Sequence, residues 1–419
     1  MIRPLQDVLS SFTINMRRAG AWTIGFAVMM VLTPLALGQT YQIIHRFAGG
    51  DGQHPSTGLS IDATGRLYGT TPGTVFRLTP SGSSWVLSTL HTFLGGTDGS
   101  SPGGRVIIGP DGSLYGTTSE GGSQGYGTVF RLRPPLNACK AALCPWAETI
   151  LHAFAGSDGN GPVGDLVFDV AGNLYGATLQ GGEQYNDKGV VYELTPSDGG
   201  WMERVLYNFP LYTLHNPRAG LTLDKAGNLY GTVQESGFQG GYGAVFQLTP
   251  SGSSWSENTL YVFQGGSDGA TPYTGLIFDD AGNLFGATTT SGANGGGTVF
   301  ELMSSNGGWA FSVLYGFAGV CCFLDGPQAN LAMDEAGNLY GTTFADGAYG
   351  LGNVFKLSPG PSGWSYTSLH DFTGLPDGAN PKSNVVFDAN GNLYGTTSAG
   401  GGRTDICDGG CGTIWRITP

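Results

Sequence analysis

Short runs of alternating apolar and polar residues, separated by turn residues, recur along the chain. In residues 275–317 this pattern predicts four strands, at 275–279, 284–288, 297–302 and 309–317. Gly-rich and polar stretches fill the gaps between them. No stretch after residue 38 places apolar residues at the spacing of three and four that an amphipathic helix requires. The pattern therefore predicts an all-β protein built from short antiparallel strands.

A single phrase, Asp-x-x-Gly-Asn-Leu-Tyr-Gly-Thr-Thr, marks each four-strand unit. Its aromatic residue recurs about every 55 residues. The seven copies are Tyr68, Tyr115, Tyr175, Tyr230, Phe285, Tyr340 and Tyr394. A fixed period of this length indicates one supersecondary unit repeated along the chain. Seven units of four antiparallel strands predict a seven-bladed β-propeller.

The last unit lacks its fourth strand, and a segment that matches this strand stands before the first unit. The final unit ends with its third strand at residues 412–417, whereas residues 44–47 (Ile-His-Arg-Phe) match 314–317 (Leu-Tyr-Gly-Phe) of a fourth strand. We therefore expect the N-terminal segment to pair with the last third strand. This pairing would close the ring and remove an exposed sheet edge.

The Asp of the repeated phrase fits a tight turn. Asp accepts hydrogen bonds from amides further along the turn, and Gly supplies the positive φ that a hairpin needs. Six copies begin with this Asp, at Asp62, Asp169, Asp224, Asp279, Asp334 and Asp388, and the second copy has Pro110-Asp111-Gly112 instead. A calcium loop is the alternative, but the dense Asp-x-Asp-x-Asp-Gly spacing is missing. We favour the turn and predict no metal site.

Residues 1–38 lie outside the repeat. Arg17 and Arg18 precede an apolar run at 19–37, and Ala36-Leu37-Gly38 offers a small-residue cleavage site. This order predicts a signal peptide at 1–38, followed by the propeller at 39–419. An uncleaved membrane anchor is the alternative, because the run is nearly long enough to span a bilayer. We expect a secreted or periplasmic protein whose only membrane contact would be an uncleaved signal.

The charge balance restricts the partners. The formal net charge is −13, and loss of residues 1–38 removes three Arg and one Asp, which gives −13 − 3 + 1 = −15. Such a surface repels phosphate backbones, so we predict no binding to nucleic acid. We expect the mature chain to be a monomer.

Six Cys form three local pairs. In an exported protein, close pairs indicate disulfides, and we predict them for Cys139 with Cys144 and for Cys407 with Cys411. A bridge between the adjacent Cys321 and Cys322 would be strained, so free thiols remain an alternative there.

Most residues with chemical potential occupy repeat positions. His45, His91, His152 and His370 alternate with Tyr207, Tyr261 and Tyr315 at one position, which favours a buried ring with a hydrogen-bonded tip over a metal ligand. The Trp residues at the starts of fourth strands are expected to pack between blades. We predict no catalytic constellation and no cofactor.

The loops between the second and third strands vary most, and variable loops on a rigid ring usually carry recognition. Their aromatic residues are Tyr126, Tyr185, Phe238, Tyr242 and Tyr349. These rings suit stacking on sugar faces, and packing over Gly-rich loops is the alternative.

The repeated Gly-Asn-Leu-Tyr-Gly-Thr-Thr and Gly-Thr-Val-Phe-x-Leu-x-Pro phrases carry a family resemblance. Over about residues 41–419 the chain resembles the GloVer tandem-repeat proteins, a group of bacterial extracellular proteins without an assigned activity. The resemblance implies export and supplies no catalytic residues. The hairpin phrase is also similar, more loosely, to NHL-type propellers.

These features favour an exported, noncatalytic recognition or scaffold propeller that binds polysaccharide or a cell-surface protein. The first alternative is a secreted enzyme, of lyase, lactonase or glycosidase type, with its site on the propeller axis. Such a site would need residues that break the repeat, and Arg105, Asp165, Arg218 and Asn330 do so without forming a recognised motif. The second alternative is a structural matrix protein.

Overall fold

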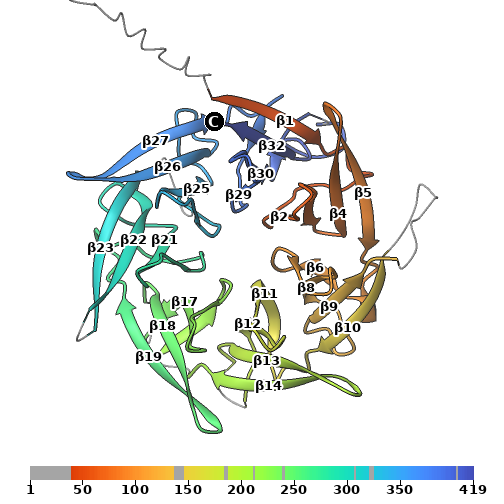
Figure 1. Cartoon of the computed structure of the whole chain (residues 1–419), viewed down its shortest axis with the longest axis vertical. Helices are drawn as coiled ribbons and strands as arrows, with labels where there is room; N and C mark the ends of the chain where they lie inside the picture. The colour runs from red at the N-terminus through yellow and green to blue at the C-terminus, as the bar shows by residue number, and fades with distance from the viewer. Residues whose placement is uncertain are drawn as a thin grey trace, which may run out of the picture. The chain divides into compact units, whose positions relative to one another are not determined.

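A computed structural model describes residues 39–419, apart from 136–145, 184–186, 211–212, 238–240, 306–307, 320–324 and 403. Seven antiparallel sheets surround a central axis (Figure 1). The predicted seven-bladed, all-β propeller with four antiparallel strands per blade is confirmed. Helix in the described residues is limited to the 3-10 turn η1 (Gly96–Asp98). None of these residues belongs to a helix with the length and apolarity needed to cross a membrane.

The first four blades follow one another along the chain, and the strands of each blade run in order from the axis outward. Blade one contains β2 (Ser60–Ile61), β3 (Leu67–Thr71), β4 (Thr74–Ser81) and β5 (Ser84–Thr92). Blade two contains β6 (Ser100–Pro102), β7 (Ile107–Ile108), β8 (Leu114–Glu120), β9 (Thr128–Arg133) and β10 (Ala147–Ala153). Blade three contains β11 (Asn160–Phe168), β12 (Leu174–Gln180), β13 (Val190–Ser197) and β14 (Gly200–Asn208). Blade four contains β15 (Leu214–Pro217), β16 (Thr222–Leu223), β17 (Leu229–Ser236), β18 (Ala244–Ser251) and β19 (Ser254–Val262).

The remaining three blades keep this order. Blade five contains β20 (Ile277–Phe278), β21 (Leu284–Thr288), β22 (Gly295–Ser305) and β23 (Gly308–Ala318). Blade six contains β24 (Ala332–Met333), β25 (Leu339–Thr343), β26 (Asn353–Gly360) and β27 (Gly363–Asp371). Blade seven contains β29 (Val386–Phe387), β30 (Leu393–Thr397), β32 (Thr413–Thr418) and β1 (Thr40–Arg46), beside a small ladder of β28 (Gly378–Ala379) and β31 (Ala399–Gly400).

The first and last strands of the described chain share blade seven. β1 pairs antiparallel with β32, with Thr40 opposite Thr418 and Arg46 opposite Thr413. The ring of Tyr41 also stacks on His370 of blade six, with centroids 3.6 Å apart. The predicted pairing of the N-terminal segment with the last third strand is therefore present.

The repeated Asp forms the turn that its sequence predicts. In blade one, an Asp62 carboxylate oxygen accepts the backbone N–H groups of Thr64 and Arg66 at 2.8 and 3.0 Å. The Tyr68 hydroxyl donates to the other oxygen at 3.0 Å. The corresponding Tyr–Asp bond recurs in blades two, three, four, six and seven. The phrase thus joins the hairpin turn to the second strand through one carboxylate.

The hydrophobic core lies between blades as well as within them. The second-strand aromatic of one blade contacts the fourth-strand Trp of the next, as in Tyr68 with Trp146 and Tyr115 with Trp201. One buried cluster likewise joins Tyr115 of blade two to Tyr192 of blade three. The predicted inter-blade role of the Trp residues is confirmed.

The His/Tyr position of the fourth strands also behaves as predicted. The Nε2 atoms of His45, His91, His152 and His370 lie 2.9–3.1 Å from an Asp carboxylate in the following loop. Tyr261 donates to Asp268 in the same way at 3.0 Å. Each of these five rings is partly buried with its polar tip satisfied.

Two local features agree with the sequence, a short connection in blade one and one disulfide. The other Cys pairs lie outside the described residues. In blade one, only Pro72 and Gly73 separate β3 from β4. The predicted disulfide between Cys407 and Cys411 is formed. Both Cys139 with Cys144 and Cys321 with Cys322 fall outside the described residues, as does the predicted signal peptide.

Candidate ligand site on the propeller axis

Each blade approaches the axis with the same short segment. It begins with a Pro and reaches, four residues later, the buried apolar residue of the first strand. The seven Pro are Pro55, Pro102, Pro162, Pro217, Pro272, Pro327 and Pro381. We call the residue after the Pro the rim-side axial position and the third residue after it the deep axial position.

The backbone bends sharply before this Pro. The preceding residue is left-handed in five blades without being Gly, with φ of 50° at His54, 55° at Ser101, 60° at Asn216, 57° at Thr271 and 55° at Asn380. Non-Gly residues adopt this conformation at a cost of order 1 kcal/mol or more, so its recurrence indicates a geometry that the surroundings impose.

Backbone hydrogen bonds hold the bend against the neighbouring blade. The Thr271 N–H donates to the carbonyl of Tyr242, and the Gly161 N–H donates to the carbonyl of Tyr126. These carbonyls belong to the variable loops between second and third strands. The loops that were predicted to carry recognition therefore position the axial segments, and both features lie toward the same rim.

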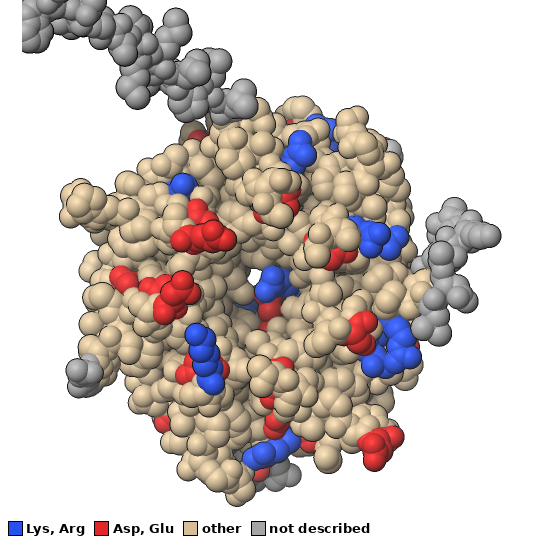
Figure 2. Space-filling view, viewed as in Figure 1, with Lys and Arg blue, Asp and Glu red and all other residues tan. Residues whose placement is uncertain are grey.

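The axial segments enclose a cavity of about 310 Å³. Its lining comes from all seven blades and consists of the Pro-initiated segments. Figure 2 shows the middle of the face in view hollowed around the propeller axis, with basic and acidic side chains visible inside. The size lies at the small end of the range of ligand sites, roughly 300–1,000 Å³.

The deep axial positions differ from blade to blade. From blade one to blade seven they are Gly58, Arg105, Asp165, Gly220, Gly275, Asn330 and Asn384. The cavity floor is therefore asymmetric, although the backbone around it is repeated.

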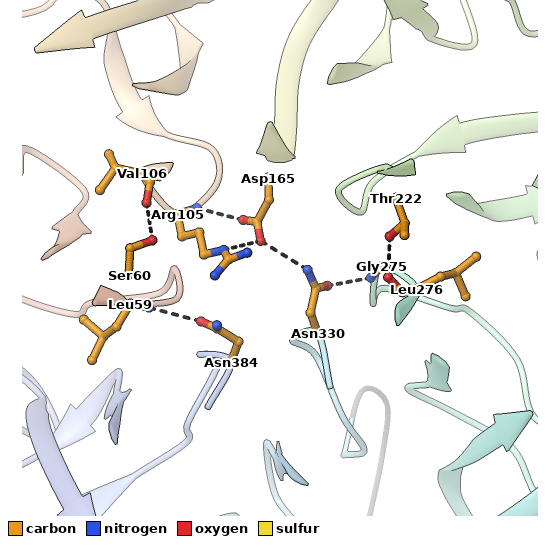
Figure 3. Close-up of polar contacts among 10 residues, drawn as sticks. All are labelled: Leu59, Ser60, Arg105, Val106, Asp165, Thr222, Gly275, Leu276, Asn330 and Asn384. Carbon is orange, nitrogen blue, oxygen red and sulfur yellow. Dashed lines mark hydrogen bonds and ion pairs between the residues drawn. The ribbon is translucent and has the colours of Figure 1, made fainter. Parts of the chain in front are cut away.

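Three of these side chains meet on the axis (Figure 3). Asp165 accepts the backbone N–H and the Nε–H of Arg105 at 3.1 and 2.6 Å. Its second oxygen also accepts the Asn330 Nδ2–H at 3.1 Å. Asn330 Oδ1 in turn accepts the backbone N–H of Gly275 at 2.6 Å. This chain of bonds joins blades two, three, six and five.

Glycine at the deep position makes room for side chains from other blades. A Cβ at Gly58 would lie 1.7 Å from Asn384 Oδ1, and one at Gly220 would lie 2.9 Å from the Asp165 Cβ. Asn384 instead uses that space to accept the backbone N–H of Leu59 at 3.1 Å.

The rim-side axial positions add basic and aromatic groups. The Arg218 guanidinium lies over the Tyr273 ring, 4.7 Å from its centroid, and the Lys382 Nζ lies 5.0 Å from the Phe344 ring. Burial, followed by the nearby charge of Arg218, lowers the pKa of Lys382. The lining thus contains three cations and one carboxylate in a strongly acidic chain.

Sequence reasoning identified part of this site. Arg105, Asp165, Arg218 and Asn330 were recognised as departures from the repeat, and the structure brings the first, second and fourth into direct contact. Lys382, Tyr273 and Asn384 were missed. Aligning the seven copies on the Pro would have exposed all of them, because the two variable positions stand in a constant frame.

The predicted loop aromatics lie elsewhere. Tyr126, Tyr242 and Tyr349 are 39, 51 and 63 % exposed, and none of the three lines the cavity. The Tyr126 and Tyr242 rings lie against Gly156 and Gly265 of the adjacent loops, so part of each ring covers backbone. Tyr185 and Phe238 fall outside the described residues.

Comparison with known families identifies the repeat. The model of the Gloeobacter/Verrucomicrobia repeat matches residues 27–237 and 143–324. The chain belongs to this family. No curated protein matches its sequence.

Solved structures resemble this family member in fold. Virginiamycin B lyase from Staphylococcus aureus has a TM-score of 0.55 at 13 % identity, covering 91 % of this chain and 99 % of its own. Aldose sugar dehydrogenase from Streptomyces coelicolor, in its PQQ-bound form, has a TM-score of 0.47 at 15 % identity, covering 90 and 98 %. At 13 % identity, the likeness to the lyase concerns the propeller fold alone.

Proposed function

We propose that this Gloeobacter/Verrucomicrobia repeat protein is an exported recognition propeller whose ligand occupies the axial cavity. The observation that carries the proposal is the asymmetry of the lining. Seven copies of one backbone segment present different polar side chains to a common space, and such convergent polar groups in a concave site are typical of ligand recognition.

A saccharide is the ligand class that fits these groups best. Amide and guanidinium donors suit sugar hydroxyl groups, and the Tyr273 ring, which has the Arg218 guanidinium over one face, adds an aromatic surface beside them. The exposed surfaces of Tyr242 and Tyr349 lie on loops of the rim toward which the axial segments bend. A polysaccharide could therefore place one unit in the cavity and neighbouring units on the rim.

The disulfide between Cys407 and Cys411 supports export, because disulfides persist in oxidising compartments. Polysaccharides and cell-surface partners are accessible in those compartments. A signal peptide at 1–38 remains part of this proposal.

An axial enzyme is the second candidate. Lys382 is the observation that favours it, since a lowered pKa brings an amine closer to the range of a general base. Asp165 is less suited to proton transfer, because both of its oxygens already accept hydrogen bonds from Arg105 and Asn330.

The test is a polysaccharide binding panel with the full chain, run beside assays for lyase, lactonase and glycosidase turnover. We expect Tyr273→Ala to weaken binding about tenfold, in line with the loss of one stacked ring. Asn258→Ala, on the outer strand β19, is the matched control and should bind like the wild type.

The other outcomes assign the function differently. Weakened binding only in Tyr185→Ala with Tyr242→Ala would move the site from the axis to the rim. Turnover that is lost in Lys382→Gln would favour the enzyme. Absence of both binding and turnover across the panels would leave the scaffold interpretation.

A further inference from the structure

The axial cavity carries a surplus of positive charge that nothing in its lining neutralises. Arg105 is paired with Asp165 at 2.6 Å, which accounts for the one carboxylate in the lining. Arg218 and Lys382 remain, and within the described part of the chain neither forms an ion pair. Two unpaired cations therefore face one small cavity.

This arrangement is unfavourable without an anion. Lys382 is half-buried, and its neighbour Arg218 repels it, which together lower the pKa of the amine. Outside residues 1–38 the chain has twice as many acidic groups as basic ones. The cavity therefore has a charge opposite in sign to that of the rest of the protein. A ligand anion between the two cations would remove the repulsion and gain two charge-assisted hydrogen bonds.

Arg105 adds a directional donor to the same space. Its bonds to Asp165 use the backbone N–H and Nε, and no bond from its Nη atoms is formed to the described residues. In Figure 3 the guanidinium lies between Asp165 and Asn384. Terminal guanidinium nitrogens in this position suit a planar carboxylate.

We propose that the axial site takes a carboxylate-bearing sugar, such as a uronic acid unit of an acidic polysaccharide. The inference rests on the axial site proposed above and names its ligand class. Arg218 and Lys382 bind the carboxylate at the rim side, and the Arg105 Nη atoms and Asn384 Nδ2 contact the acid or ring hydroxyl groups at the floor. A carboxylate is favoured over a phosphate because one negative charge suffers less repulsion from the acidic protein than two.

The experiment compares a charged and an uncharged form of one sugar. Calorimetric titration of the full chain with polygalacturonate and galacturonate, and with galactose as the neutral match, measures the charge preference. We expect galacturonate to bind at least about tenfold tighter than galactose, and its affinity to fall as salt is raised.

Substitutions assign this preference to the cavity. Lys382→Gln and Arg218→Gln should each weaken galacturonate binding roughly tenfold or more, and should weaken galactose binding much less. Lys356→Gln is the matched control, because Lys356 also lies over an aromatic ring, Tyr340 at 5.5 Å, but outside the cavity. Thermal unfolding of each variant checks that the fold is intact.

The remaining outcomes separate this inference from the proposed function. Equal affinity for galacturonate and galactose, with binding still weakened by Tyr273→Ala, would overturn the acidic ligand and keep the axial site. No effect of any cavity variant on any ligand would overturn both. Inorganic phosphate or sulfate binding as tightly as galacturonate, with the same dependence on Lys382, would overturn the carboxylate class.

Discussion

One residue position on the fourth strands decides how each blade meets the next. The residue two after the Trp, which on β1 corresponds to Tyr41, faces the His/Tyr ring of the preceding blade. At three interfaces it is aromatic and stacks, as in Tyr261 with Phe311, whose centroids are 3.8 Å apart. At three others it is a glutamate, and one of these, Glu148, lies 3.6 Å from His91 Nε2, beside Asp98. The choice between ring and carboxylate makes these interfaces respond differently to pH.

Glu148 should make the protein less stable at alkaline pH. Burial, followed by the hydrogen bond and charge of Asp98, raises the pKa of Glu148 from 4.5 to about 8. The unfolded carboxyl ionises near 4.5 and the folded one near 8, so stability falls as pH rises between these values. We expect Glu148→Gln to melt on the order of 2 °C above the wild type at pH 9 and close to it at pH 4.

The same repeat position supplies the control for this pH series. Glu257 of blade four corresponds to Glu148, and Tyr207 takes the place of the His that it faces. Glu257→Gln therefore measures what the loss of a carboxylate at this position does when no His lies opposite. A Glu148→Gln variant whose melting temperature differs from the wild type by the same amount at pH 4 and pH 9 would contradict the raised pKa.

The sequence predicted residue roles where the repeat itself was informative. Because His and Tyr alternate at one position, a ring with a satisfied polar tip could be predicted, and His45 with Asp51 and Tyr261 with Asp268 confirm it. The glutamates could not be placed opposite these rings, since their meeting depends on how adjacent blades are offset.

Among the elements, β1 has the most consequential position, because it belongs to the last blade while it begins the described chain. Removing residues 39–46 would leave the edge of β32 exposed and the His370 ring without Tyr41. We expect this deletion to lower the melting temperature by about 10 °C or more, on the scale of losing one whole strand of a core sheet.

An exposed hairpin tests whether this loss is specific. Gly252 and Ser253 connect β18 to β19 on the surface, and replacing them by Asn-Gly suits a two-residue hairpin turn. This variant should melt within a few degrees of the wild type. Similar melting temperatures for the wild type and the β1 deletion would show that β1 is dispensable.

The loop before β32 is held by its disulfide. Cys407 and Cys411 are buried in the core cluster that includes Phe47, and the Cys411 carbonyl accepts the His54 N–H at 2.8 Å. Closing so short a loop is worth roughly 2 kcal/mol. We expect the double variant Cys407→Ser with Cys411→Ser to have a free energy of unfolding lower by about this amount. Denaturant unfolding measures the difference as a lower midpoint concentration.

Reductant provides the control for this substitution. Reductant should lower the free energy of unfolding of the wild type and affect the double variant much less. The effect that remains in the double variant measures what the other cysteines contribute. An equal effect of reductant on both proteins would assign the stabilisation to bonds other than Cys407–Cys411.

For the whole molecule, the seven-bladed ring could be predicted from the sequence, but the site on its axis could be predicted only in part. Repeat period, strand count and turn chemistry are local properties, and they sufficed for seven blades. Arg105, Asp165 and Asn330 lie far apart in sequence, and only the ring geometry makes them neighbours. Local patterns identify such departures, but which of them meet is set by the arrangement of all seven blades.

The bonds across the axis predict energetic coupling between distant blades. Asp165 of blade three accepts a hydrogen bond from Asn330 of blade six, and its side chain is only 17 % exposed. In a double-mutant cycle on unfolding, Asp165→Ala and Asn330→Ala should be non-additive by about 1 kcal/mol, the range for residues in direct contact. Asp165→Ala alone should cost more, roughly 2–3 kcal/mol, because Arg105 loses its charged partner.

A matched pair without contact tests the geometry of this cycle. Asn392 also donates its Nδ2–H to an aspartate, at 2.7 Å from Asp388, but within its own turn at the edge of blade seven. Asp165→Ala with Asn392→Ala should be additive. Equal coupling in both cycles would mean that the effect spreads through the ring in general, whereas coupling confined to Asn330 would locate it in the layer that forms the cavity floor.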